Sequence, residues 1–142
     1  MRTYDPGLVV ITLGNDPIQG PFADGTFIIV ERNEELYSQK VGADGEVSRA
    51  RNRNRSGKIT LRLHQTSPSN EVLSSLAFTG ENQGTDVLPI SVEDLSGTAL
   101  HKGGQAWVQK YPIAENAKET TDREWVIGVA DLSMLVGSNN AD

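Results

Sequence analysis

Similar side chains recur at every second position in this sequence, and the alternation is strictest where four arginines stand at alternate positions. In an extended strand successive side chains point to opposite faces, so alternate residues line one face at a spacing of about 6–7 Å. The guanidinium groups are therefore predicted to form a stripe on one strand face. Like charges this close repel one another, so the stripe is expected to lie against an acidic surface. The four residues are Arg49, Arg51, Arg53 and Arg55.

The rest of the chain is acidic enough to supply that surface. The sequence has 13 basic side chains, so nine lie outside the stripe, beside 19 acidic ones, and the net charge is −6. Nucleic-acid binding depends on neutralising phosphates with basic side chains, so this balance argues against general affinity for DNA or RNA. The planar fork of arginine is suited to both oxygens of a carboxylate. The stripe favours a subunit that binds copies of itself over a solvated strand face without a partner.

Turn signals flank the stripe and predict a protruding arm at about residues 38–58. Asp44 and Gly45 are typical of a type I′ turn between two strands, Tyr37–Val41 and Glu46–Arg53. A ribbon of this composition buries little by itself and is expected to be mobile until it docks. If the arm docks on a different patch of the next copy, the contact is heterologous and propagates into a ring or a stack. The predicted inter-subunit contacts are Asp44, Gly45, Arg49, Arg51, Arg53 and Arg55.

Elsewhere the pattern is mainly that of strands. Leu8–Leu13 and Thr26–Glu31 are apolar at consecutive positions, which is typical of central strands. From Ile59 to Leu63 apolar and polar residues alternate, as in a strand with one face buried. With 142 residues and no long linker, residues 1–142 are expected to form a single domain that is mainly β.

One short helix is predicted at about residues 68–79. Ser67 is suited to cap its first turn, Pro68 fits the first helical position, and Gly80 is expected to end it. Residues 137–142 are expected to form a flexible tail.

No residue pattern predicts catalysis, a cofactor or a metal site. The chain has no cysteine, and neither His64 nor His101 has neighbours at metal-ligand spacing. The nucleophile, phosphate-loop and dinucleotide-binding motifs are absent from the sequence. The acid pairs Glu34-Glu35 and Glu93-Asp94 are more typical of solvated loops or strand ends than of an acid–base pair. A non-enzymatic protein is therefore expected.

Two further expectations concern burial and location. Trp107 and Trp125 stand in alternating apolar strands and are predicted to lie in the core. The apolar runs are too short to span a membrane as a helix, and the first residues lack the apolar segment of a signal peptide. We therefore expect a soluble protein.

Five segments resemble the tail tube protein family of contractile-tailed bacteriophages. The resemblance implies a β-sandwich or barrel-like core flanked by one helix, with an extended hairpin arm that reaches an adjacent ring. It also implies hexameric rings stacked head-to-tail into a hollow tube. None of the segments is a catalytic signature. They are YDPGLVVITLG, FADGTFIIVERNEE, VGADGEVSRARNRNRSG, SGKITLRLHQTSPSNEVLSSL and DREWVIGVADLSMLVG.

The resemblance further implies a virion protein that is assembled in the host cytoplasm and conducts the genome during ejection. Its partners would be copies of itself, the tail sheath protein, and baseplate and tail terminator proteins. An acidic bore would let genomic DNA pass without specific binding. Two alternatives remain open. One is a tail completion or baseplate protein of the same fold, and the other is a nucleic-acid-binding module that uses the arginine ribbon.

Overall fold

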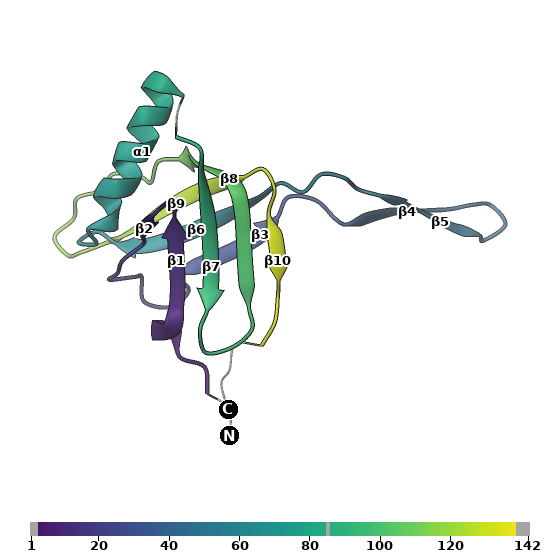
Figure 1. The fold of residues 1–142 in the computed structure, drawn as a ribbon, viewed down its shortest axis with the longest axis horizontal. Coiled ribbons are helices and arrows are strands. Elements are labelled where there is room, and N and C mark those ends of the chain that lie inside the picture. The colour runs from purple at the N-terminus through teal and green to yellow at the C-terminus, as the bar shows by residue number, and fades with distance from the viewer. Residues whose placement is uncertain (1–2, 85, 139–142) are drawn as a thin grey trace.

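A β-rich body and a long hairpin that projects from it make up the fold (Figure 1). The computed structural model describes residues 3–84 and 86–138. The prediction of a mainly β fold with one helix is confirmed. The body contains a short 3-10 turn, η1 (Pro6–Leu8), one helix, α1 (Ser69–Gln83), and the strands β1 (Val9–Leu13), β2 (Asp16–Pro17), β3 (Ile28–Arg32), β6 (Gly57–His64), β7 (Leu88–Asp94), β8 (Leu100–Lys110), β9 (Asp122–Val129) and β10 (Ser133–Leu135). The hairpin is made of β4 (Tyr37–Val41) and β5 (Val47–Arg51).

The eight body strands form one antiparallel sheet in the order β2-β1-β7-β8-β9-β6-β3, with β10 paired to β8. Strand β8 pairs with β7 and β10 near its start and with β9 near its end. The register of β8 shifts against both β7 and β9. Near the middle of β8, the Asp131 carboxylate accepts hydrogen bonds from the N–H groups of Gly104 (3.0 Å) and Gln105 (3.1 Å). The irregular β8 is thus the middle strand that joins β2-β1-β7 to β9-β6-β3, and both halves contribute to one core.

Alternate residues of the body strands build that core. Strand β6 contributes Ile59, Leu61 and Leu63, none of which is accessible to solvent. Trp125 is also buried, and its Nε1 donates a 2.9 Å hydrogen bond to Asn70 at the start of the helix. The remaining members of the same cluster are Ile11, Leu13, Ile18, Leu73, Ile90, Val92, Ala106, Ile127, Val129 and Leu132.

The helix begins within one residue of the predicted position but ends later than predicted. It begins at Ser69, after an N-cap Pro68 that provides no side-chain cap. The Ser67 hydroxyl accepts a 3.3 Å hydrogen bond from the Ser69 N–H, as predicted for a residue that caps the first turn, and it also donates to the Gln19 carbonyl, which ties the helix start to the loop after β2. The helix continues past Gly80 and ends at Gly84. A Cβ at Gly80 would collide with the Asp86 carboxylate. This glycine therefore allows Asp86 to approach the helix closely, and it does not mark the end of the helix.

The two segments predicted as central strands lie near the borders of the sheet. On one side β1 has only the two-residue β2, and β3 is the last strand at the other end. Their outward side chains remain partly exposed, with Val10 at 38% and Ile29 at 36%. The prediction of two central strands was therefore wrong. A run of apolar residues is typical of a strand that is covered on both faces, but it also occurs in a border strand that presents an apolar side chain outward.

Three predictions about burial are also resolved by the fold. Trp125 is in the core as predicted, but Trp107 is only half-buried, because Ala106 takes the core-facing position beside it. Trp107 lies across Gly128 on the outer side of β9. Asp94, predicted to be solvated, is 6% exposed.

The C-terminal segment that was expected to be flexible is described only in part. Residues 139–142 lie outside the described residues. The Ser138 carbonyl accepts a 2.8 Å hydrogen bond from the backbone of Thr98, so the chain is tied to the body at this point. Within the part of the chain that the structure describes, no helix is long and apolar enough to cross a membrane.

Candidate functional site

The hairpin arm, residues 33–56, is the candidate functional site because it extends away from the body (Figure 1). Its strands pair antiparallel from Tyr37 opposite Arg51 to Val41 opposite Val47. All ten residues of β4 and β5 are exposed. The predicted two-stranded ribbon is therefore confirmed. The body resumes at the buried Gly57 of β6, so the arm ends slightly earlier than predicted.

The turn at the arm's tip is not the predicted type I′ turn. That turn requires positive φ at both central residues, whereas among the described residues only glycines have positive φ, including Gly45 at 85°. The Gly42 N–H donates to the Glu46 carbonyl (2.8 Å), and the Gly45 N–H donates to the Gly42 carbonyl (2.9 Å). The strands are thus joined by a three-residue loop, 43–45, with glycine in the left-handed position. A two-residue signal in the sequence did not reveal the additional residue.

The two faces of the arm differ in chemistry. Residues directly opposite one another in an antiparallel pair share a face. One face carries small or polar residues and one lysine: Ser38, Lys40, Ser48 and Ala50. The other, which we call the arginine face, consists of Tyr37, Gln39, Val41, Val47, Arg49 and Arg51.

The arginine face combines cations with exposed apolar surface. The guanidinium carbon of Arg49 lies 4.2 Å from the centre of the Tyr37 ring, a cation–π contact that orients both side chains. Val41 and Val47, nearer the tip, are each 59% exposed. Exposed valines and a tyrosine on a projecting ribbon are typical of a surface that another chain covers.

The arginine stripe follows the strand only at Arg49 and Arg51, since β5 ends there. The side chain of Asn52 accepts a 2.9 Å hydrogen bond from the N–H of Asn54, and Asn54 accepts one of 3.0 Å from Ser56. Asparagine side chains that bond to nearby backbone groups compete with strand pairing. The prediction that all four arginines share one face of a regular strand was therefore wrong for Arg53 and Arg55.

Three of the four arginines, Arg51, Arg53 and Arg55, lie together with Arg32 at the root of the arm. A cavity of about 580 Å³ at the root of the arm, which we call the basal pocket, is lined by arginines and two apolar side chains. Arg32 enters it from the end of β3, and its Nε and Nη2 donate to the Leu132 carbonyl (3.1 and 2.6 Å). Arg32 was not among the predicted site residues, because only the return of the chain to β6 brings it beside the other arginines. The lining residues are Arg32, Leu36, Tyr37, Arg51, Asn52, Arg53 and Arg55.

The positive charge of the basal pocket is not balanced within the described residues. The ion pairs found in residues 3–84 and 86–138 join Lys58 to Glu31 and Arg62 to Glu124, and neither includes an arginine of the pocket. Glu34, in the loop before β4, accepts a 2.7 Å hydrogen bond from the Asn52 amide instead. The pocket is therefore suited to carboxylates from outside its own chain.

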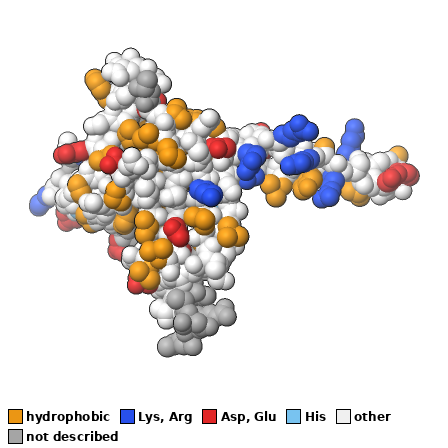
Figure 2. Space-filling model, viewed as in Figure 1, with side chains coloured by type: hydrophobic (Ala, Val, Ile, Leu, Met, Phe, Trp, Pro, Cys, Tyr) orange, Lys and Arg blue, Asp and Glu red, His pale blue; other side chains and the backbone are white. Residues whose placement is uncertain are grey.

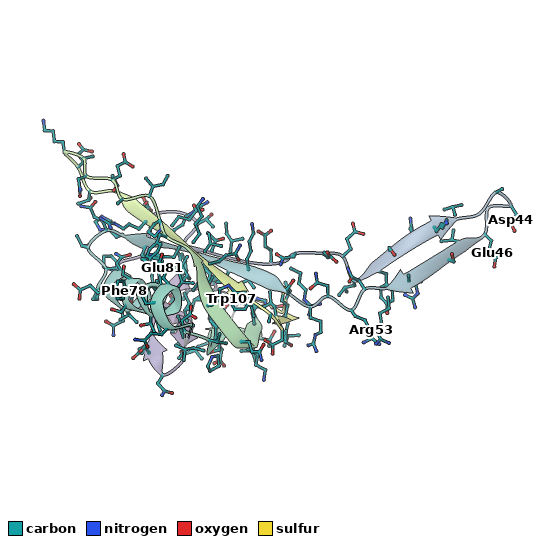
Figure 3. The ribbon with its side chains drawn as sticks, turned by 90° about the horizontal axis from the view of Figure 1, so that it is seen from above. Asp44, Glu46, Arg53, Phe78, Glu81 and Trp107 are labelled. Carbon is teal, nitrogen blue, oxygen red and sulfur yellow. The ribbon has the colours of Figure 1, made fainter. Side chains whose placement is uncertain are left out.

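The opposite end of the arm is acidic. Asp44 and Glu46 lie at the tip, far along the ribbon from Arg53 (Figure 3). The space-filling view shows basic side chains on the stem of the arm and acidic ones at its end (Figure 2). Asp44 was predicted as a turn residue and as an inter-subunit contact, whereas Glu46 was not among the predicted site residues, although both carboxylates are readable beside Gly45.

The two histidines lie in different surroundings. The Nδ1 of His64 lies 2.8 Å from the Thr66 hydroxyl. His101 lines an apolar cavity of about 270 Å³ that also contains Asp94, and burial lowers the pKa of His101. Asp94 Oδ1 accepts hydrogen bonds from Ser96, while Asp94 Oδ2 and His101 Nδ1 are buried without a hydrogen-bond partner. Among the described residues no group of three metal-ligating side chains occurs.

Comparisons with known proteins agree with this architecture. Residues 14–137 match the family model described as the bacteriophage PhiTE tail tube protein. The chain is 30% identical over 145 residues to structural protein ORF10 of Pseudomonas phage KPP10, which covers 96% of this chain and 83% of that protein.

Solved structures with a similar fold come from contractile injection systems. One such chain comes from the sheath–tube complex of an extracellular contractile injection system in its extended state. It has a TM-score of 0.61 at 13% identity, and the match covers 94% of this chain and 91% of that chain. The cap that terminates the tube of an anti-feeding prophage has a TM-score of 0.59 at 10% identity, with coverage of 95% and 92%. A sheath/tube terminator of the first system has a TM-score of 0.52 at 13% identity, with coverage of 94% and 97%.

Proposed function

Because the chain belongs to the bacteriophage PhiTE tail tube protein family, we propose that its copies form hexameric rings that stack head-to-tail into the tube. Its family and its phage relative make it a structural component of the virion. The proposed activity is self-assembly, in which the arm of each subunit binds a neighbouring subunit. This role requires no catalytic group.

The projecting arm is the observation on which this proposal rests. A two-stranded hairpin is marginally stable by itself in water, and this one packs no strand residue into its own body. It nevertheless presents valines, a tyrosine and arginines on one face. A ribbon of this kind gains stability when it docks on another chain, and a contact between unlike patches of identical subunits propagates.

The sheet is suited to the same assembly. In the described part of the chain, β2 and β3 are the terminal strands of the sheet. Open strand edges invite pairing with another chain, and closing them in a ring removes this liability. We propose that body sheets of six copies lie edge to edge around a central channel. The apolar side chains at the borders of the sheet, Val10 and Ile29, would then be covered by neighbouring subunits.

The channel is proposed to conduct the phage genome during ejection. The net charge of −6 supports this, because a negative wall repels DNA phosphates instead of binding them. The sheath and the terminator are proposed as further partners, since similar folds occur in a sheath–tube complex and in a sheath/tube terminator.

A tube-terminating or other tail completion role is the second candidate. Two of the similar solved chains close a tube instead of extending it. A terminator binds the end of a tube but does not polymerise. Purified protein at high concentration distinguishes the two roles: a tube subunit forms long tubes in electron micrographs, whereas a terminator forms single rings or remains monomeric.

Charge reversal in the arm tests the proposed function directly. The double variant Arg51→Glu/Arg53→Glu is expected to form no tubes in negative-stain micrographs, because its arm would repel the acidic surface of its partner. The matched variant Arg51→Lys/Arg53→Lys keeps the charge and is expected to retain shorter or fewer tubes, because lysine loses the bidentate contact.

Both variants are expected to keep the circular dichroism spectrum and melting temperature of the unaltered monomer, since the exchanged side chains contact no core residue. Tubes of normal number and length from the glutamate variant would overturn the role of the arm.

A further inference from the structure

Each subunit carries a cationic pocket at one end of its arm and two carboxylates at the other. We propose that the acidic tip of one subunit's arm binds in the basal pocket of a second copy's arm. This inference rests on the proposed function in requiring that the arm contacts another subunit. It goes further by naming the carboxylates that the arginines bind.

The basal pocket requires an anionic occupant. Arg51, Arg53 and Arg55 line it together with Arg32, and in the described residues none of the four is paired with a carboxylate. Grouped guanidinium ions repel one another, and the repulsion is relieved when a carboxylate lies between them. The cavity of about 580 Å³ is large enough to admit a turn and the ends of its side chains.

The tip of the arm has the matching charge. Asp44 Oδ1 accepts a 3.2 Å hydrogen bond from the N–H of Glu46, which holds the two acidic residues in one compact loop. Both residues are exposed. Two carboxylates present four acceptor oxygens to the guanidinium donors, enough for bidentate pairing with more than one arginine.

Apolar surface provides a second, independent match. Val41 and Val47 lie directly behind the tip, and each is 59% exposed. Leu36 and Tyr37, which line the pocket, are 62% and 44% exposed. Placing the tip in the pocket would cover both pairs together. A purely ionic partner, such as a nucleic-acid backbone, would leave these four side chains in water.

The tip and the pocket of one chain cannot meet each other. They lie at opposite ends of a hairpin whose strands are fully paired, as the separation of Asp44 and Glu46 from Arg53 shows (Figure 3). The contact must therefore be made between copies. In the proposed head-to-tail stack each tip binds the pocket of the next copy, so the contact is heterologous and links successive copies in one direction.

Body carboxylates are less suited to this pocket. Several already have partners: Glu31 and Glu124 form ion pairs, and Asp131 accepts hydrogen bonds from β8. A carboxylate on the sheet would also have to enter a concave site from a broad surface. A narrow tip with two carboxylates meets the steric requirement.

Two charge-reversed variants with full-length chains test the pairing. The tip-reversed variant carries Asp44→Lys/Glu46→Lys, and the base-reversed variant carries Arg51→Glu/Arg53→Glu. Alone, each is expected to reduce tube mass at least tenfold in a sedimentation assay. The tip-reversed variant places a positive tip opposite a positive pocket, and the base-reversed variant leaves a pocket without net positive charge, since Arg32 and Arg55 then only balance the two glutamates. An equimolar mixture of the two is expected to restore tubes, because the lysine tips of one variant then meet the glutamates introduced in the pocket of the other, and native acidic tips meet native arginine pockets.

The neutral variant Asp44→Asn/Glu46→Gln is the control for the turn, because asparagine retains the side-chain acceptor that bonds to residue 46. It is expected to weaken assembly without changing hairpin chemical shifts in NMR spectra. If the tip-reversed variant assembles normally while the base-reversed variant does not, the tip is not the occupant and this inference fails alone. If the base-reversed variant assembles normally, the proposed role of the arm fails as well.

Disulfide trapping gives a second measurement. The chain has no cysteine, so there is no background reaction. The double variant Asp44→Cys/Arg53→Cys is expected to form a ladder of covalent oligomers upon mild oxidation at assembling concentrations. Single-cysteine variants are expected to give at most dimers. Oxidation that leaves the double variant monomeric would contradict the tip-to-pocket contact, and oxidation that stops at a doubly linked dimer would contradict its head-to-tail form.

Discussion

The strands of the body and those of the arm have similar alternating sequences but different surroundings. In β6, every second residue from Ile59 to Leu63 is completely buried, and the intervening residues lie on the outer side of the sheet. In β4 and β5, the alternation produces an arginine face and a small polar face, yet both are exposed. Alternation of side-chain types thus predicts a strand, but side chains are buried only where a second layer of the structure covers the strand. The arm lacks such a layer within its own chain, and we propose that another subunit provides it.

Truncation of an apolar side chain is expected to show the largest difference between the two regions. Leu61→Ala in the body should destabilise the monomer by about 2–5 kcal/mol, because it leaves a cavity in the core. Val47→Ala in the arm should change the free energy of unfolding by less than about 0.5 kcal/mol, as is usual for exposed sites, while weakening tube formation. Urea denaturation of the monomer and sedimentation of tubes measure the two effects. A large loss of monomer stability in Val47→Ala would show that the arm packs on its own body.

Glycine substitutions in the body and in the arm are expected to have smaller effects on stability. At Gly57, where the arm returns to the body, a Cβ would lie 2.6 Å from the Glu31 carbonyl and collide with the Leu132 side chain. Gly57→Ala is therefore expected to cost about 1–3 kcal/mol of global stability through overpacking. Gly45 has open space around it but a φ of 85°, so Gly45→Ala should cost about 1–2 kcal/mol in the hairpin alone.

Thermal denaturation and hydrogen exchange separate these two costs. Gly57→Ala should lower the melting temperature, whereas Gly45→Ala should speed amide exchange only in β4 and β5. Equal melting temperatures for Gly57→Ala and the unaltered chain would mean that Leu132 moves aside without cost.

The smallest expected effect is the pH dependence of the body. Burial lowers the pKa of His101 below its ordinary value of 6.5, so the unfolded chain binds a proton more readily than the folded one. Stability from this site is present above pH 6.5 and is lost as the pH falls below it. Asp94 lines the same cavity.

The variant His101→Gln is expected to show a smaller loss of stability between pH 7.5 and pH 5.5 than the unaltered chain. Urea denaturation at several pH values measures this. An identical pH dependence in both proteins would exclude His101 as its source. The hairpin is expected to be unaffected, because none of its residues is near this cavity.

Local features of the chain were predicted well from sequence. The hairpin arm, the strand at β6 and the burial of Trp125 each follow from alternation and turn residues within a short segment. The errors arose where a second segment decided the outcome. Gly80 does not end the helix because Asp86 lies against it, and Trp107 is outside the core because its neighbour Ala106 faces inward.

The candidate site was predicted only in part for the same reason. Four of its arginines are visible in the sequence, and their spacing correctly pointed to a ribbon. The basal pocket was not foreseen, because Arg32 comes from the strand before the arm and Asn52 ends the strand that was expected to continue. The acidic tip was visible in the sequence, but only the extended hairpin places it at the opposite end from the arginines.

By itself the sequence determined the strands, the ribbon and the charge that the ribbon carries, because strand formation and turn formation depend on neighbouring residues. That the ribbon protrudes was also predicted from the sequence, but the pocket formed by its arginines, and the place of Arg32 in that pocket, follow from the tertiary structure alone. These features depend on which distant segments pair, since β3 and β6 lie side by side and thereby set the two ends of the arm together at its root. A chain with the same ribbon on another body would carry the same charges without this pocket.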